Sequence, residues 1–100
     1  MTFEKVLQVF HDYLQKDSMY EIVTTSHGYA LMEWDEMEQN WNESFHLPTP
    51  EHMLEKLLNA YQMFLTWQML CDTDREELNT DEQAQVVSQS EWLRRKCMEI

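Results

Sequence analysis

The chain has 100 residues, of which 43% are hydrophobic and 12% aromatic, so it is expected to fold as one compact domain over residues 1–100. Its 19 acidic residues against 7 basic ones give a formal net charge of −12 at pH 7. Such a surface repels nucleic acid and anionic membranes, and it attracts basic surfaces such as nucleic-acid-binding grooves. The one basic cluster is Arg94-Arg95-Lys96, so direct binding to nucleic acid is not expected.

The first element in chain order is a helix. Thr2 is a typical N-cap residue, and Glu4 lies in the first turn, where the helix dipole favours an acid. Apolar residues then recur at helical spacing up to an expected end near residues 16–18. This apolar stripe consists of Phe3, Val6, Leu7, Phe10, Tyr13 and Leu14.

Three strands are expected next, over residues 20–25, 29–34 and 41–46, because these segments are rich in β-branched and aromatic residues. The first turn contains Gly28, the one glycine of the chain, which is expected to adopt a positive φ. Pairing across the second connection places Trp34 beside Trp41 as a cross-strand aromatic pair. The acids between these tryptophans then form the exposed tip of a hairpin.

Thr49-Pro50-Glu51 predicts the start of a long helix that ends near Leu70. Its core face is expected to consist of Leu54, Leu57, Leu58, Tyr61, Phe64 and Leu65. The second half also carries Met63, Trp67, Met69 and Leu70, so it is apolar on most sides. This part of the helix is therefore either central to the fold or in contact with a partner.

Two capping-box patterns follow, Thr73–Glu76 and Thr80–Gln83. They predict a short helical turn and a last helix over about 81–96, with an apolar stripe of Val86, Val87, Leu93 and Cys97. The chain is thus expected to be α+β, with an N-terminal helix, a three-stranded antiparallel meander, a long central helix and a C-terminal helix.

No catalytic residue, metal or cofactor is predicted, and the protein is not expected to be an enzyme. His52-x-x-Glu55 offers two possible metal ligands on one helix face, but surface side chains are the simpler interpretation. Cys71 and Cys97 are isolated and are interpreted as buried small hydrophobic residues. The N-terminal segment lacks the pattern of a signal peptide, so a cytoplasmic location with reduced thiols is expected.

The acids fall into two dense groups. Residues 33–43 contain five acids and no base, and residues 72–82 contain six acids against Arg75 alone. If both groups line one face, they could imitate a phosphate backbone and occupy a cationic nucleic-acid channel, with nearby aromatic residues as anchors. The candidate partner-binding residues are Glu33, Asp35, Glu36, Glu38, Glu43, Asp72, Asp74, Glu76 and Glu77, with Trp34 or Trp41 as an anchor if either is exposed.

Two other interpretations remain open. Helix capping and the usual polarity of hairpin tips explain many of these acids without any partner, which would leave an acidic structural or regulatory adaptor. Such an adaptor could be a homodimer formed through the apolar surface of residues 63–70. An enzyme or metalloprotein is the third class, and bound metal would reveal it.

In size, charge, compactness and the order of its elements, the whole chain resembles the small acidic proteins of phages and mobile elements, anti-CRISPR proteins in particular. No motif carries this resemblance, so no residue role is transferred by it. It implies a function by binding, namely inhibition of a CRISPR effector nuclease at its target-DNA or protospacer-adjacent-motif site. Immunity proteins that inhibit nucleases are similar in the same respects.

Overall fold

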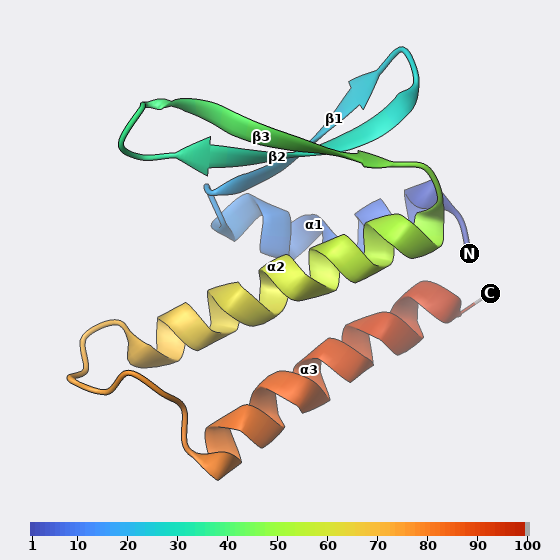
Figure 1. Cartoon of the computed structure of the whole chain (residues 1–100). Helices are drawn as coiled ribbons and strands as arrows, with labels where there is room; N and C mark the ends of the chain where they lie inside the picture. The colour runs from blue at the N-terminus through green and yellow to red at the C-terminus, as the bar shows by residue number, and fades with distance from the viewer. Residues whose placement is uncertain (100) are drawn as a thin grey trace.

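The computed structural model describes residues 1–99, apart from the side chains of Glu43 and Ser44. Its elements follow the order helix, three strands, two helices, which confirms the expected α+β architecture (Figure 1). The bounds are α1 Phe3–Lys16, β1 Tyr20–Thr25, β2 Gly28–Asp35, β3 Asn40–Leu47, α2 Pro50–Leu70 and α3 Thr80–Met98.

The three strands form an antiparallel meander in the order β1-β2-β3. Gly28 opens β2 with φ +113°, as the sequence predicts, since side chains rarely adopt this conformation. A register shift follows Glu33 in the β2–β3 pairing, so Trp34 lies opposite Trp41. Beyond this irregularity, the hairpin extends over the C-terminal half of α2 (Figure 1).

One face of the sheet packs on α1 and α2, and α3 lies on the far side of α2 (Figure 1). The core joins α1, the sheet and both long helices through fully buried side chains such as Phe10, Leu47 and Cys97. Burial raises the pKa of the Cys97 thiol. Cys71 is only partly buried, so the expectation that both cysteines lie in the interior is half right.

Two helix starts are capped as the sequence predicts. The Thr2 hydroxyl accepts from the Lys5 N–H at 3.1 Å, and the Thr49 hydroxyl accepts from the His52 N–H at 3.1 Å. Each bond satisfies a backbone donor that has no partner within its helix. Pro50 occupies the first turn of α2, where its missing N–H costs nothing.

The two predicted capping boxes are wrong. No helical turn opens at Thr73, whose hydroxyl instead donates to the Leu70 carbonyl at 2.7 Å and accepts from the Arg75 N–H at 3.2 Å. The cap of α3 is Asn79, one residue before the predicted Thr80, and Asn79 forms the capping box with Glu82. Asparagine is the better N-cap residue, and the same three-residue spacing also leads from Asn79 to an acid.

The apolar stripe of α3 also differs from the prediction at one position. Val86, Leu93 and Cys97 are buried, but Val87 is 57% exposed. Ser90 takes its place in the interior, because it follows Val86 by one helical turn and Val87 does not share that face.

Candidate partner-binding surface

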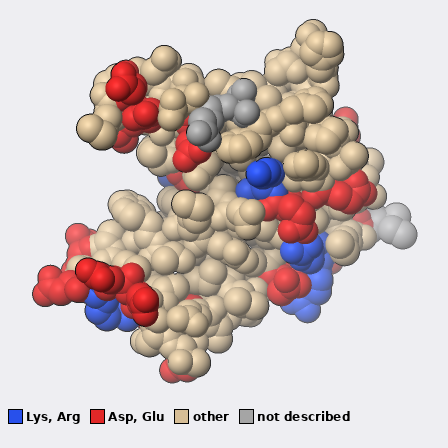
Figure 2. All heavy atoms as spheres, viewed as in Figure 1, with Lys and Arg blue, Asp and Glu red and all other residues tan. Residues whose placement is uncertain are grey.

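The two acidic groups lie at the same end of the molecule. The turn between β2 and β3 and the connection between α2 and α3 are both on the left in Figure 1, although more than 30 residues separate them in the chain. Figure 2 shows the carboxylates of both turns on this end. We call Asp35, Glu36 and Glu38 the hairpin block, and Asp72, Asp74, Glu76 and Glu77 the loop block.

The hairpin block is held by one of its own acids. Asp35 Oδ1 accepts from the backbone N–H groups of Met37 at 2.9 Å and Glu38 at 3.2 Å. Gln39 adopts a positive φ of 53° and donates from Nε2 to the Glu36 carbonyl at 2.7 Å. These bonds fix the turn and leave the exposed carboxylates of Glu36 and Glu38 directed to solvent.

The loop block is held by residues outside it. Arg75 donates from both terminal nitrogens to the carboxylate of Glu82, at 2.5 and 2.9 Å. Glu82 also accepts from the Asn79 N–H at 3.0 Å, and the bond from Arg75 is the main cause that lowers the pKa of Glu82 to about 2. The guanidinium therefore satisfies an acid of α3 and leaves the four acids of the loop block uncompensated.

Helix capping does not account for the loop block. Only Asp81 and Glu82 lie in the first turn of α3, whereas the loop block precedes that helix. Among the described residues, no hydrogen bond or ion pair involves the side chains of Asp72, Asp74, Glu76 or Glu77. All four are exposed, so their charge acts on whatever approaches this end.

The predicted tryptophan anchors do not meet the condition of exposure. Trp34 and Trp41 are half-buried against each other, with ring centroids 5.2 Å apart in an edge-to-face arrangement. This pair confirms the predicted cross-strand contact, and its role is to close the hairpin. Glu33 is half-buried beneath the hairpin, and the side chain of Glu43 lies outside the described residues.

The exposed apolar residues at this end are ones that the site prediction missed. Met63 and Trp67 of α2 are each 62% exposed, and Met37 at the hairpin tip is 93% exposed. Met63 and Trp67 are four residues apart and lie off the core stripe of Leu54, Leu58 and Leu65. That spacing was the available signal, since such a pair shares one helix face.

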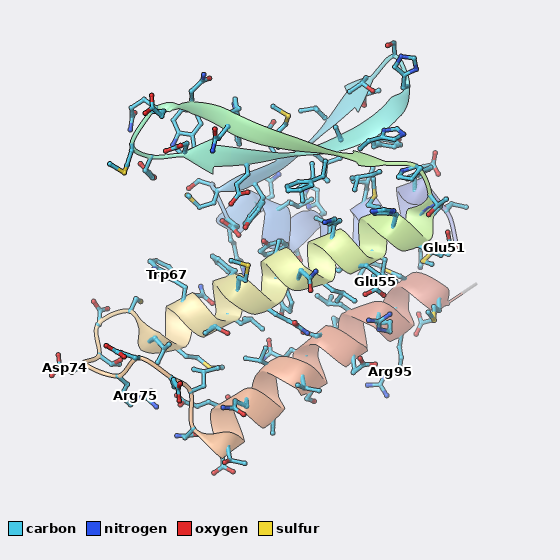
Figure 3. All side chains as sticks on the ribbon, viewed as in Figure 1. Glu51, Glu55, Trp67, Asp74, Arg75 and Arg95 are labelled. Atoms are coloured by element: carbon cyan, nitrogen blue, oxygen red, sulfur yellow. The ribbon has the colours of Figure 1, made fainter. Side chains whose placement is uncertain are left out.

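A cleft of about 600 Å³ separates the hairpin from the second half of α2. Trp67 extends from α2 toward this space, and Figure 2 shows the corresponding notch between the hairpin and the helices (Figures 2 and 3). The α2 wall is apolar and the hairpin wall is acidic. The cleft is lined by Met63, Phe64 and Trp67 from α2, by Glu33 and Glu36 from the hairpin, and by residues 16–20 between α1 and β1.

The opposite end of the molecule carries paired charges of both signs. Arg94 of α3 donates to the carboxylate of Glu55 in α2 at 2.5 Å, and its Nε lies 3.5 Å from Glu91. Lys96 lies 3.5 Å from Glu99. Glu51, Glu55 and Arg95 are labelled on this side in Figure 3. The two ends therefore differ in net charge, whereas exposed apolar side chains also occur away from the acidic end, among them Trp92 and Met98 of α3.

Neither a cluster of metal ligands nor a membrane-spanning helix is found among the described residues. In the described part of the chain, no group of three His, Cys, Asp or Glu side chains could hold a metal ion. His52 and Glu55 therefore have no third ligand there. The helices of the described part of the chain are all too short or too polar to cross a bilayer.

Comparison with known proteins gives no relative for this chain: no family model, no curated protein and no solved structure matches it.

Proposed function

We propose that this protein binds and inhibits a nucleic-acid enzyme by placing its acidic end in the enzyme's cationic DNA channel. The observation that carries the proposal is that the hairpin and loop blocks lie at the same end of the fold. Seven exposed or half-exposed carboxylates there resemble a phosphate backbone in charge, because a duplex carries about one charge per 1.7 Å of its axis. The resemblance to anti-CRISPR proteins makes a CRISPR-associated nuclease the preferred target, met in the cytoplasm.

The arrangement of charge and apolar surface also supports binding over catalysis. The acids would speed association with a basic surface, and a desolvated aromatic residue would slow dissociation. Trp67 and Met63 line the cleft between the hairpin and α2, next to Glu36 of the hairpin block, where such an anchor is most useful.

The test is affinity capture from cells with this protein as bait, at low and at moderate salt. We expect a basic nucleic-acid enzyme that is released as salt rises and that DNA displaces from the bait. Recovery of a neutral or acidic partner that salt does not affect would contradict the proposal, and so would recovery of the bait alone.

Charge reversal then locates the contact. Glu36→Lys/Glu38→Lys combined with Glu76→Lys/Glu77→Lys changes both blocks but keeps Asp35, which builds the hairpin turn. We expect association with the captured enzyme to slow roughly tenfold to hundredfold, because steering by long-range charge is lost. The matched control reverses Glu4, Asp12, Glu21 and Glu51, which lie outside the two blocks, for the same change in net charge. Equal loss in both variants would show that net charge alone matters.

The second candidate is an acidic adaptor that forms a homodimer through Met63 and Trp67, since both side chains are largely exposed. The two candidates differ in their response to salt. Two copies that pair at this end would bring like charges together, so salt would strengthen the dimer, whereas salt weakens binding to a basic enzyme. Light scattering at low and high salt, with Trp67→Ala as the comparison, distinguishes them.

A further inference from the structure

We propose that the cleft between the hairpin and α2 binds an arginine side chain of the partner, with the guanidinium stacked on Trp67 and facing Glu33 and Glu36. This inference rests on the proposed function in one respect, that the arginine belongs to the basic partner. It adds the chemical group that the protein recognises and the place where that group binds.

The aromatic wall of the cleft is fixed before any partner arrives. The ring of Trp67 stacks on Phe64, with centroids 6.5 Å apart and an angle of 26° between the planes. Phe64 packs edge-on against Tyr13, whose hydroxyl donates to the buried Asp17 at 2.6 Å. A ring held in this way loses little conformational entropy on binding, and one of its faces is free to accept a planar cation.

The acidic wall faces this ring from the hairpin. Asp17 uses its carboxylate internally, because Oδ2 accepts from Tyr13 and Oδ1 accepts from the Met19 N–H at 3.0 Å. Glu36 is therefore the exposed carboxylate open to a guest, and Glu33 is a second, half-buried carboxylate that also interacts with the Tyr20 hydroxyl. Burial raises the pKa of Tyr20 in this cleft, and the negative charges of Glu33 and Asp17 raise it further, as expected where the local potential favours a cation.

An arginine fits these two walls better than other occupants do. An apolar segment would remove Glu33 and Glu36 from water without compensation, at a substantial free-energy cost. A lysine ammonium is compact and strongly hydrated, whereas a guanidinium is planar, stacks on aromatic rings and donates to carboxylates from its edge. A volume of about 600 Å³ is of the size that binds small ligands and is ample for one side chain.

The test is an NMR titration of the whole chain with a terminally blocked Gly-Arg-Gly peptide. The indole N–H of Trp67 is the reporter, and Trp92 of α3 is the internal control, because it is 53% exposed and its ring already has the Lys96 ammonium at 5.4 Å. We expect a saturable shift at Trp67 and none at Trp92. The citrulline peptide, which has the same shape without the charge, should not bind, and the lysine peptide should bind roughly tenfold more weakly. Equal shifts at both tryptophans, or equal binding of citrulline, would overturn the proposal.

Substitutions at the rim of the cleft should act in opposite directions. Glu36→Gln should weaken binding of the arginine peptide on the order of two- to fivefold, as expected for an exposed charge pair. Lys16, which also lines the cleft, competes with a cationic guest, so Lys16→Gln should strengthen binding by a similar factor. If both variants bind the peptide as the wild type does, the cleft is not the site.

Affinity for the captured enzyme separates this proposal from the proposed function. Trp67→Ala should weaken that complex roughly tenfold, and Trp92→Ala should leave it unchanged. If reversal of the acidic blocks abolishes the complex while Trp67→Ala does not weaken it, the arginine site is wrong and the proposed function stands. If the arginine peptide binds at Trp67 but no basic enzyme is captured, the cleft chemistry stands and the proposed function fails.

Discussion

The hairpin block and the loop block carry the same kind of charge, but they are held in place differently. In the hairpin block, Asp35 is both a surface acid and the side chain that closes the turn. In the loop block, the turn is fixed by Thr73, Asn79 and the Arg75–Glu82 pair, none of which belongs to the four uncompensated acids. In the hairpin block an acid both carries charge and supports the turn, whereas in the loop block different residues have these two roles.

This difference decides which acids can be removed without damage. The acids of the loop block should be dispensable for folding, because no described contact depends on their side chains. The hairpin block can lose Glu36 and Glu38 without harm, but the removal of Asp35 also leaves two backbone donors without an acceptor. A reversal of Asp35 together with Glu36 and Glu38 would therefore confuse loss of charge with loss of the turn.

The largest expected effect comes from the aromatic pair that supports the hairpin block. Trp41→Ala removes the contact with Trp34 and should cost about 2 kcal/mol of unfolding free energy, below the value for a fully buried ring. Urea denaturation measures the loss, and amide hydrogen exchange should show faster opening at residues 34–41 and unchanged exchange in α3. If amide exchange becomes faster by the same factor at residues 34–41 and in α3, the tryptophan pair stabilises the whole fold and not the hairpin alone.

The cap of α3 should have the next largest effect. Asn79→Ala removes the side-chain acceptor for the Glu82 N–H at 2.8 Å, and the expected cost is about 1 kcal/mol. Asn79→Asp keeps that acceptor and serves as the control, with stability close to that of the wild type. If the alanine variant matches the control in thermal unfolding, the capping box does not support the loop block.

The smallest effect is the dependence of the loop block on pH. The pKa of Glu82 is lowered in the folded state from its ordinary value of 4.5 to about 2. Its contribution to stability is therefore complete above pH 4.5 and is lost as the pH falls from 4.5 to about 2. The thermal midpoint of the wild type should approach that of Glu82→Gln over this interval, and the gap should be small because solvent screens an exposed ion pair. If the difference between the two thermal midpoints does not change with pH, the Arg75–Glu82 ion pair does not cause the pH dependence of stability.

The fold could be predicted from the sequence because its signals are local. Caps at Thr2 and Thr49, the glycine turn at Gly28 and the pair of Trp34 and Trp41 each depend on residues close in the chain. The start of α3 was misplaced by one residue because two overlapping patterns satisfy the same spacing rule. Asn79 forms the cap because asparagine is the better N-cap residue, and Glu82 also accepts from Arg75, a contact that spacing within one helix does not reveal.

The candidate surface could be predicted only in part. A dense run of acids is visible in any sequence, but the position of both runs at one end depends on how the sheet lies across α2. The sequence predicts that residues 63–70 of this apolar helix are either central to the fold or in contact with a partner, but it does not place Trp67 beside the acids. Only the fold shows that the core of α2 ends near Leu65 and that the helix continues beyond it.

The extension of the hairpin past its support has a consequence for binding. Leu31 and Leu47 pack the sheet onto the helices. Beyond Glu33, the tip of the β2–β3 hairpin projects over α2 with the cleft between them. Among the described residues, the tip of the hairpin therefore has no core contact with α2, and the cleft takes the place of that packing. A side chain bound there as proposed would supply a contact between the hairpin tip and the helices that the described residues alone do not make.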